Sequence, residues 1–140
     1  MKILGFTFPD DLLYDPEKHV WVRIESDSVV SIGVTDLGQY MAGKIFQITV
    51  KQKGEKVNGR SILFSLESAK WIGKFRLPIE GEIIDVNEEV IKNPSLINQR
   101  PYDSWIVKIR VNDMDVIRNV FKTIQDAYKQ FEEEAKRVVR

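Results

Sequence analysis

The sequence of 140 residues contains no cysteine and a single histidine, His19. Without cysteine the chain can form no disulfide, thiolate–zinc site or cysteine nucleophile, and one histidine excludes a multi-histidine metal site. Neither charge predominates, because lysine plus arginine and aspartate plus glutamate each number 21. This balance argues against general binding to nucleic acid or to an anionic membrane surface, so we expect neither partner.

Long apolar runs are also missing from the sequence. The first nine residues are apolar for only a short stretch before Asp10 and Asp11, which is too short for the core of a signal peptide. No other run is long enough to span a bilayer. We therefore expect a cytoplasmic protein with no membrane partner, long enough to bury a core without disulfides or metals.

Most of the chain alternates short β-rich segments with turn residues. Segments 20–24 and 29–34 are rich in β-branched residues, and residues 25–28 between them have the composition of a hairpin turn. Further segments of this kind are 45–50, 62–66, 75–78, 81–86 and 105–111. Many short strands separated by glycine, proline, asparagine and aspartate indicate a compact β-barrel or sandwich.

Two helices are expected beside these strands. Thr35 or Asp36 can cap a short internal helix, and Gly43 is placed to end it. After Asn112 or Asp113, apolar residues recur at steps of three and four, which predicts one amphipathic C-terminal helix. We therefore expect three parts: an N-terminal segment over 1–18, a β-domain over 19–111 and a helix over 112–140 packed on that domain.

Few residues suggest catalysis. The sequence has no Ser/His/Asp arrangement, no glycine-rich phosphate loop and no histidine cluster, and His19 is expected to have a structural role at the start of a strand. The segment that stands out is 67–71, Glu-Ser-Ala-Lys-Trp, which lies between two predicted strands. Lys70 is therefore expected at a hairpin tip, exposed on a rigid base. Exposed lysines at turns are common, so this position alone assigns no function.

Several further motifs occur in an order that carries a family resemblance. Segment 14–22 has a tyrosine followed by His-x-Trp-Val, and segment 32–36 reads Ile-Gly-Val-Thr-Asp. After the Glu-Ser-Ala-Lys segment come Pro-Ile-Glu-Gly-Glu-Ile, Pro-Ser-Leu-Ile-Asn, a Pro-Tyr pair and Trp105. In this order the motifs resemble those of the glycine-cleavage H proteins over residues 14–111.

The resemblance implies a fold and a cofactor. That family folds as a barrel-sandwich hybrid, so we expect a mainly β protein of this kind with a short internal helix and a C-terminal amphipathic helix. Lys70 aligns with the lysine that receives lipoate through an amide bond, and Glu67, Ser68, Ala69 and Trp71 are expected to flank it as recognition residues. The chain is then a carrier without catalytic residues, whose swinging arm visits the active sites of partner enzymes.

Other carriers of this general kind fit the sequence less well. Biotin carriers typically place methionine on both sides of their lysine, whereas Lys70 lies between Ala69 and Trp71. Acyltransferase lipoyl domains typically carry Asp-Lys-Ala and are joined to a catalytic domain, which we do not find here. An interaction domain without lipoate on the same scaffold is a further alternative.

Three positions depart from the family pattern. Val20 and Lys74 stand where acidic residues are usual, and Leu37 stands where a histidine is usual. The resemblance assigns these positions to the cleft that shelters the arm when it carries an aminomethyl group, and the changes remove polar partners for that cargo. We therefore expect an H-like lipoate-binding protein that serves sulfur oxidation. The alternative is the H protein of glycine cleavage, which carries the aminomethyl group.

The expected partners follow from these two interpretations. Both require a lipoate ligase or a lipoyl synthase system to modify Lys70, and a dihydrolipoamide dehydrogenase to reoxidise the arm. Sulfur oxidation adds a heterodisulfide-reductase-like complex. Glycine cleavage adds glycine decarboxylase and aminomethyltransferase.

Overall fold

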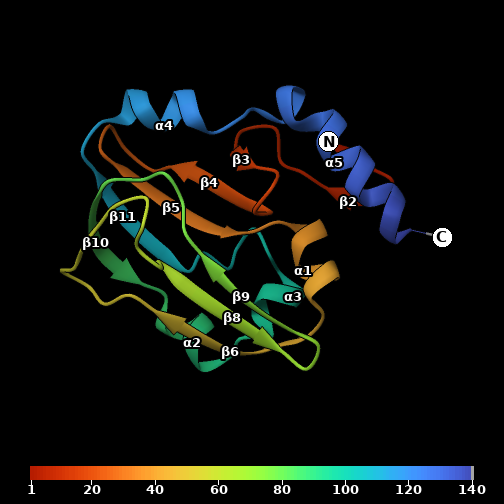
Figure 1. The fold of residues 1–140 in the computed structure, drawn as a ribbon, viewed down its shortest axis with the longest axis horizontal. Coiled ribbons are helices and arrows are strands. Elements are labelled where there is room, and N and C mark those ends of the chain that lie inside the picture. The colour runs from red at the N-terminus through yellow and green to blue at the C-terminus, as the bar shows by residue number, and fades with distance from the viewer. Residues whose placement is uncertain (140) are drawn as a thin grey trace.

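The computed structural model describes residues 1–139, and its described strands form three antiparallel sheets (Figure 1). In order across the largest sheet, the strands are β3 (Leu13–Asp15), β4 (Val20–Ile24), β5 (Val29–Val34), β11 (Val107–Val111), β10 (Gly81–Val86) and β7 (Lys56–Val57). The three-stranded sheet consists of β6 (Ile45–Val50), β8 (Phe64–Ser68) and β9 (Trp71–Phe75). A small hairpin pairs β1 (Lys2–Ile3) with β2 (Phe6–Thr7).

The two larger sheets enclose the main hydrophobic core. Alternate residues of most of these strands point inward, as the two-residue period of a strand predicts. Val22 and Ile32, which are paired between β4 and β5, are fully buried in the same cluster as Leu66 and Phe75 of the smaller sheet. The strands expected over 20–24, 29–34, 45–50 and 81–86 have those bounds in the structure. The expectation of a mainly β fold is therefore confirmed.

Three short helices interrupt the strands, where the sequence predicted one. They are α1 (Asp36–Ala42), α2 (Glu88–Lys92) and α3 (Leu96–Gln99). Thr35 caps α1, its side-chain oxygen accepting the backbone N–H of Gly38 at 3.0 Å, and Gly43 ends the helix as expected. The helices α2 and α3 are too short for a 3.6-residue period to appear in the sequence.

The C-terminal region contains two helices rather than the single one expected. They are α4 (Met114–Val120) and α5 (Ile124–Val138). Between them Lys122 forms a β-bridge with Tyr14, with backbone hydrogen bonds of 2.7 and 2.8 Å in the two directions. Thr123 then caps α5 by accepting the backbone N–H of Asp126. The apolar spacing continues through this break, so periodicity alone did not reveal it.

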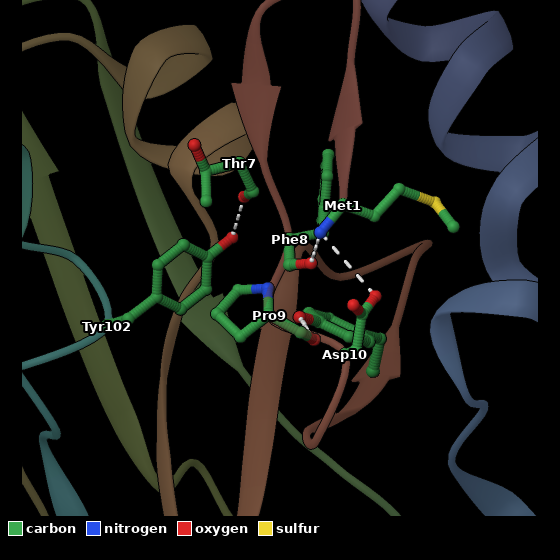
Figure 2. Close-up of polar contacts among 7 residues, drawn as sticks. Met1, Thr7, Phe8, Pro9, Asp10 and Tyr102 are labelled. Atoms are coloured by element: carbon green, nitrogen blue, oxygen red, sulfur yellow. Dashed lines mark hydrogen bonds and ion pairs between the residues drawn. The ribbon is translucent and has the colours of Figure 1, made fainter.

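The N-terminal segment and α5 build a second hydrophobic cluster. The Phe8 and Phe131 rings have centroids 4.4 Å apart, and Tyr14 meets Phe131 edge-on at 5.6 Å. Figure 2 shows the Met1 amino group donating to the carbonyl of Phe8 at 2.8 Å and pairing with Asp10 at 3.5 Å. No helix among residues 1–139 is long and apolar enough to cross a membrane.

Candidate functional site

Lys70 lies at the tip of the β8–β9 hairpin. Ser68 pairs with Trp71 across the two strands, so Ala69 and Lys70 are the only residues of the turn, and both are exposed. The hairpin rests on the core, which Leu66 and other inward residues of these strands enter. A short turn on a buried base holds the lysine backbone in place, as the sequence predicted.

The Lys70 side chain lies over Gly43, the residue that ends α1. A Cβ atom on Gly43 would stand 3.0 Å from Cε of Lys70. Gly43 has φ 81° and ψ −170°, a conformation open almost only to glycine. Ser68 joins the two elements, because its buried hydroxyl donates to the carbonyl of Ala42 at 2.7 Å. Ser68 was expected to flank Lys70 as a recognition residue. Its side chain is buried and hydrogen-bonded within the protein.

Asn98 of α3 holds the junction between α1 and β6 through side-chain hydrogen bonds. Its amide nitrogen donates to the carbonyl of Gly43 at 2.8 Å and to the side-chain oxygen of Gln39 at 3.0 Å. Its side-chain oxygen accepts the backbone N–H of Ile45 at 2.9 Å. Asn98 therefore ties the end of α1 to the start of β6 beneath Lys70. Asn98 belongs to the Pro-Ser-Leu-Ile-Asn motif, but nothing in that motif indicates a role beside Lys70.

The other end of α1 is held by Tyr102 and the N-terminal segment. The Tyr102 hydroxyl accepts the backbone N–H of Asp36 at 3.1 Å and donates to the carbonyl of Thr7, a contact drawn in Figure 2. The backbone N–H of Thr7 donates to the Asp36 carboxylate at 2.9 Å. Burial raises the pKa of Tyr102 well above its ordinary value, so the hydroxyl keeps its proton and this role as a donor.

A cleft of about 330 Å³ opens beside the hairpin. It lies between α1, strand β9 and the loop that leads into β4. Its lining residues include the charged side chains Glu17, Lys18 and Lys74. The rest of the lining is largely apolar and includes Ala42, Ile45, Leu66, Phe75 and Ile97. The cleft is thus an apolar pocket with a few charges.

Trp71 forms the hairpin side of this cleft. Its ring covers Gly73, where any side chain would collide with it, and meets Phe75 edge-on at 6.1 Å between centroids. The residue is still 37% exposed. Trp71 therefore packs over the hairpin and also presents an aromatic surface next to Lys70.

His19 lines the cleft from the loop before β4. It has a positive φ of 60°, and its carbonyl accepts the backbone N–H of Thr35 at 3.0 Å. Within the described residues, its Nδ1 atom is buried and has no hydrogen-bond partner. Burial lowers the His19 pKa, and nearby Glu134 and Asp15 only partly oppose this effect. His19 therefore borders the cleft while its ring lies near Phe131 of α5, and from the sequence only a structural role was expected for it.

Two of the three expected cleft residues lie elsewhere. Val20 and Leu37 are fully buried and do not line the cleft, whereas Lys74 does. Val20 begins β4 and packs in the main core, and Leu37 packs in the second cluster with α5. His19, the residue before Val20, is among the lining residues instead. Differences from the family pattern at Val20 and Leu37 therefore do not change the cleft surface directly.

Comparison with known proteins assigns the family. Residues 12–134 match the family model described as Glycine cleavage H-protein. The chain belongs to the glycine cleavage H-protein family. Proteins of this family are lipoyl carriers that hold lipoate covalently on a lysine, and lipoate is accordingly the cofactor of this chain.

Two relatives from one organism differ widely in their similarity to the chain. The "Probable glycine cleavage system H protein 3" of Saccharolobus solfataricus is 86% identical over 140 residues and covers 100% of both chains. The "Probable glycine cleavage system H protein 2" of the same organism is 38% identical over 116 residues, covering 81% of this chain and 78% of the relative. Saccharolobus solfataricus therefore has two chains of this family with clearly different sequences.

A solved structure supports the fold. The crystal structure of a glycine cleavage system H protein from Mycobacterium marinum superposes with a TM-score of 0.77 at 23% identity. The match covers 88% of this chain and 98% of the other. The expected lipoyl-domain-like, barrel-sandwich fold of the H-protein family is confirmed.

Proposed function

We propose that Lys70 is the lipoylation site and that the chain is a carrier without catalytic activity of its own. The observation that carries this proposal is the placement of Lys70, exposed at the tip of a two-residue turn and directly beside an apolar cleft. Lipoate would be joined to the Lys70 amine as an amide, and its dithiolane would supply reversible thiol–disulfide chemistry. Enzymes that act on the arm would supply the catalytic groups.

The residues around Lys70 fit such an arm. Gly43 leaves room for the lysine methylenes, because a Cβ at that position would stand 3.0 Å from Cε of Lys70. Ser68 and Asn98 hold the base of the hairpin against α1, so the start of the arm would stay fixed while its tip moves. A fixed base and a flexible tip raise the effective concentration of the cargo at a partner's active site. The cleft offers an apolar surface against which the arm would lie between visits.

For the cargo, we propose first the aminomethyl group of glycine cleavage. This reading rests on the family match and on the names of the relatives. Glu17, one of the cleft residues, would offer a carboxylate to a cationic amine. The partners would then be glycine decarboxylase, aminomethyltransferase, dihydrolipoamide dehydrogenase and a lipoate ligase or lipoyl synthase system.

A second candidate is an anionic sulfur cargo, passed to a heterodisulfide-reductase-like complex during sulfur oxidation. The observation in its favour is the charge of the cleft. Lys18 and Lys74 oppose the single carboxylate of Glu17, and His19 is neutral, so the lining carries one excess positive charge. Such a lining attracts an anion and repels a cationic amine. Saccharolobus solfataricus has two distinct members of this family, and two members could carry two different cargoes.

The attachment site is tested by incubating the purified chain with lipoic acid, ATP and a lipoate–protein ligase. The wild-type chain should gain one lipoyl group on Lys70, as located by peptide mass spectrometry. Lys70→Arg should gain none, because a guanidinium is not acylated in this reaction. Lys74→Arg, a change of the same kind four residues away, should be modified like the wild type. Modification of Lys70→Arg on another lysine would refute the proposal.

The cargo is tested with the lipoylated chain in a reconstituted glycine-cleavage assay beside an authentic H protein. Under the first candidate, the chain should support decarboxylation at a rate close to that of the authentic protein. Under the second, its rate should be much lower, and Lys18→Gln combined with Lys74→Asp should raise it. Lys53→Asp combined with Lys56→Gln, at two exposed positions outside the cleft lining, changes the net charge by the same amount and is the control.

A further inference from the structure

Two large apolar side chains are exposed on the outer face of the hairpin sheet. Phe46 of β6 is 53% exposed and Ile72 of β9 is 65% exposed. Ile72 pairs with Glu67 of β8, and Glu67 pairs in turn with Gln47, the residue after Phe46. Phe46 and Ile72 thus lie on either side of Glu67, close to the hairpin tip. We call Phe46 and Ile72 the hairpin patch.

A β-bulge directs Phe46 outward. The pairing of β6 with β8 shifts between Ile45 and Gln47, so both Phe46 and Gln47 are exposed between the buried residues Ile45 and Ile48. Bulges often redirect a side chain next to a functional site. Ile72 is exposed on the outer face and the next residue, Gly73, is buried, as alternation along a strand predicts. Both side chains keep more than half of their surface exposed, and neighbouring apolar groups exposed to water favour association with a partner.

The length of the Lys70 side chain indicates which partner meets this patch. An unmodified lysine extends only about 6 Å from its Cα, given bonds of about 1.5 Å. An enzyme that acylates Lys70 must therefore bring its active site against the hairpin tip itself. Ile72 is two residues from Lys70, a separation of about 7 Å along a strand, and Phe46 is on β6, two strands away from β9. Both lie close enough to Lys70 for an enzyme bound over the hairpin tip to contact them.

Enzymes that act on the finished arm do not need this contact. Once the lysine carries lipoate, the reactive end lies more than twice as far from Cα, and a partner's active site can receive it without covering the outer face. The hairpin patch is thus within reach of the enzyme that acylates Lys70, which must approach the hairpin tip more closely than the other partners. Glu67, half exposed between its two members, adds a negative charge for a cationic group of that partner.

We propose that Phe46 and Ile72 dock the lipoate-transferring enzyme that acts on Lys70. This inference rests on the proposed function of Lys70. In the reaction, the carboxyl of lipoic acid is activated by ATP with release of pyrophosphate. The Lys70 amine then forms the amide as AMP leaves, and two protons of the ammonium pass to solvent. The patch takes no part in this chemistry and acts only through binding.

The test measures steady-state lipoylation of Phe46→Ser, Ile72→Ser and the double variant, with lipoic acid, ATP and a lipoate–protein ligase that modifies the wild-type chain. Each single variant should lower kcat/KM at least about fivefold, mainly through a higher KM for the carrier, because docking contacts are lost while the chemistry is unchanged. The matched control is Val116→Ser, an apolar residue of α4 that is 44% exposed at the opposite end of the molecule (Figure 1). It should stay within about twofold of the wild type.

Two further measurements separate docking from a change in the hairpin itself. N-Hydroxysuccinimidyl acetate should acylate Lys70 at the same rate in all variants, since no protein docks in that reaction. Fully lipoylated variants should be reduced by dihydrolipoamide dehydrogenase like the wild type. Unchanged enzymatic lipoylation of the double variant, or an equal loss in either of these measurements, would overturn the inference. Failure of the wild-type chain to gain lipoate on Lys70 would instead overturn the proposed function.

Discussion

Gly43 is the position where the chain's backbone and the proposed arm constrain one another most directly. Its φ of 81° and ψ of −170° lie in a region that side chains strongly disfavour. Holding an alanine there costs about 1–3 kcal/mol. We therefore expect Gly43→Ala to lower the free energy of unfolding by about that amount.

The crowding of Lys70 by the new methyl group should add little to this loss. The nearest atom to a Cβ on Gly43 is Cε of Lys70, at 3.0 Å, and the next is Nζ at 3.7 Å. Both belong to the end of a long exposed side chain, which can swing away. Adding Lys70→Ala to Gly43→Ala should therefore recover less than about 0.5 kcal/mol, the range expected for weakly coupled sites.

Two other glycines provide matched controls. Gly54 has φ 93° but no atom within 4 Å of its would-be Cβ, so Gly54→Ala tests backbone strain alone and should cost about 1–2 kcal/mol. Gly59 has no left-handed φ, and the nearest atom to its would-be Cβ is 3.9 Å away. Gly59→Ala should be neutral or stabilising by about 0.4–1 kcal/mol, because alanine restricts the unfolded chain.

The assay is urea unfolding, followed by tryptophan fluorescence and circular dichroism. It compares the wild type with Gly43→Ala, Gly54→Ala, Gly59→Ala and the double variant Gly43→Ala/Lys70→Ala. The expected order of stability is Gly59→Ala at or above the wild type, then Gly54→Ala, with Gly43→Ala at or below Gly54→Ala. If Gly43→Ala proves as stable as Gly59→Ala, the reasoning from backbone strain is wrong. A large recovery on removing Lys70 would show that the side chain, rather than the backbone, sets the cost.

Two further predictions concern residues around the cleft. Ser68→Ala removes the buried hydroxyl that donates to Ala42 and leaves that carbonyl without this donor, so urea unfolding should show a loss of about 1–3 kcal/mol. Ser65→Ala, a half-buried serine on the same strand, is its control, and equal losses in the two variants would contradict the role of the Ala42 contact. Because burial lowers the His19 pKa below 6.5, the unfolded chain takes up a proton there before the folded chain does. The contribution of His19 to the free energy of unfolding is therefore fully present above pH 6.5. It falls as the pH drops towards the folded-state pKa, by at most about 1.4 kcal/mol per pH unit. His19→Asn is the reference variant, because asparagine tolerates the left-handed backbone at this position. Relative to it, the wild type should lose stability between pH 7.5 and 5. A stability difference that does not change with pH would refute the lowered pKa of His19.

The sequence by itself determined the elements whose signals are local. Alternating apolar residues and turn composition predicted β4, β5, β6 and β10 with their observed bounds, because each strand's pattern depends on its own residues. Lys70 was predicted between strands over 62–66 and 75–78. The hairpin forms, but its strands are 64–68 and 71–75, so those two bounds were wrong and the turn is shorter than the sequence suggested. Thr35 and Gly43 marked the ends of α1 because caps are also local.

The neighbourhood of Lys70 was decided by the tertiary structure. Asn98 contacts Gln39, Gly43 and Ile45, more than fifty residues away, and no pattern within the α3 segment indicates those partners. Likewise, the pairing of Lys122 with Tyr14 interrupts a helical pattern that would otherwise continue. Such contacts depend on which segments the sheets bring together, and short-range periodicity carries no information about that.

The residues that line the cleft show most clearly what the tertiary structure decided. The family resemblance assigned Val20 and Leu37 to the cleft, but both are fully buried and neither lines it, whereas His19 does. Val20 packs in the main core and Leu37 in the second cluster, and the position of each residue in the sequence does not reveal which cluster its side chain enters. The sequence could determine that a lysine stands at a hairpin tip. Only the packing of α1 and the β4 loop against that hairpin decided which side chains surround the proposed arm, because those contacts join segments far apart in the chain.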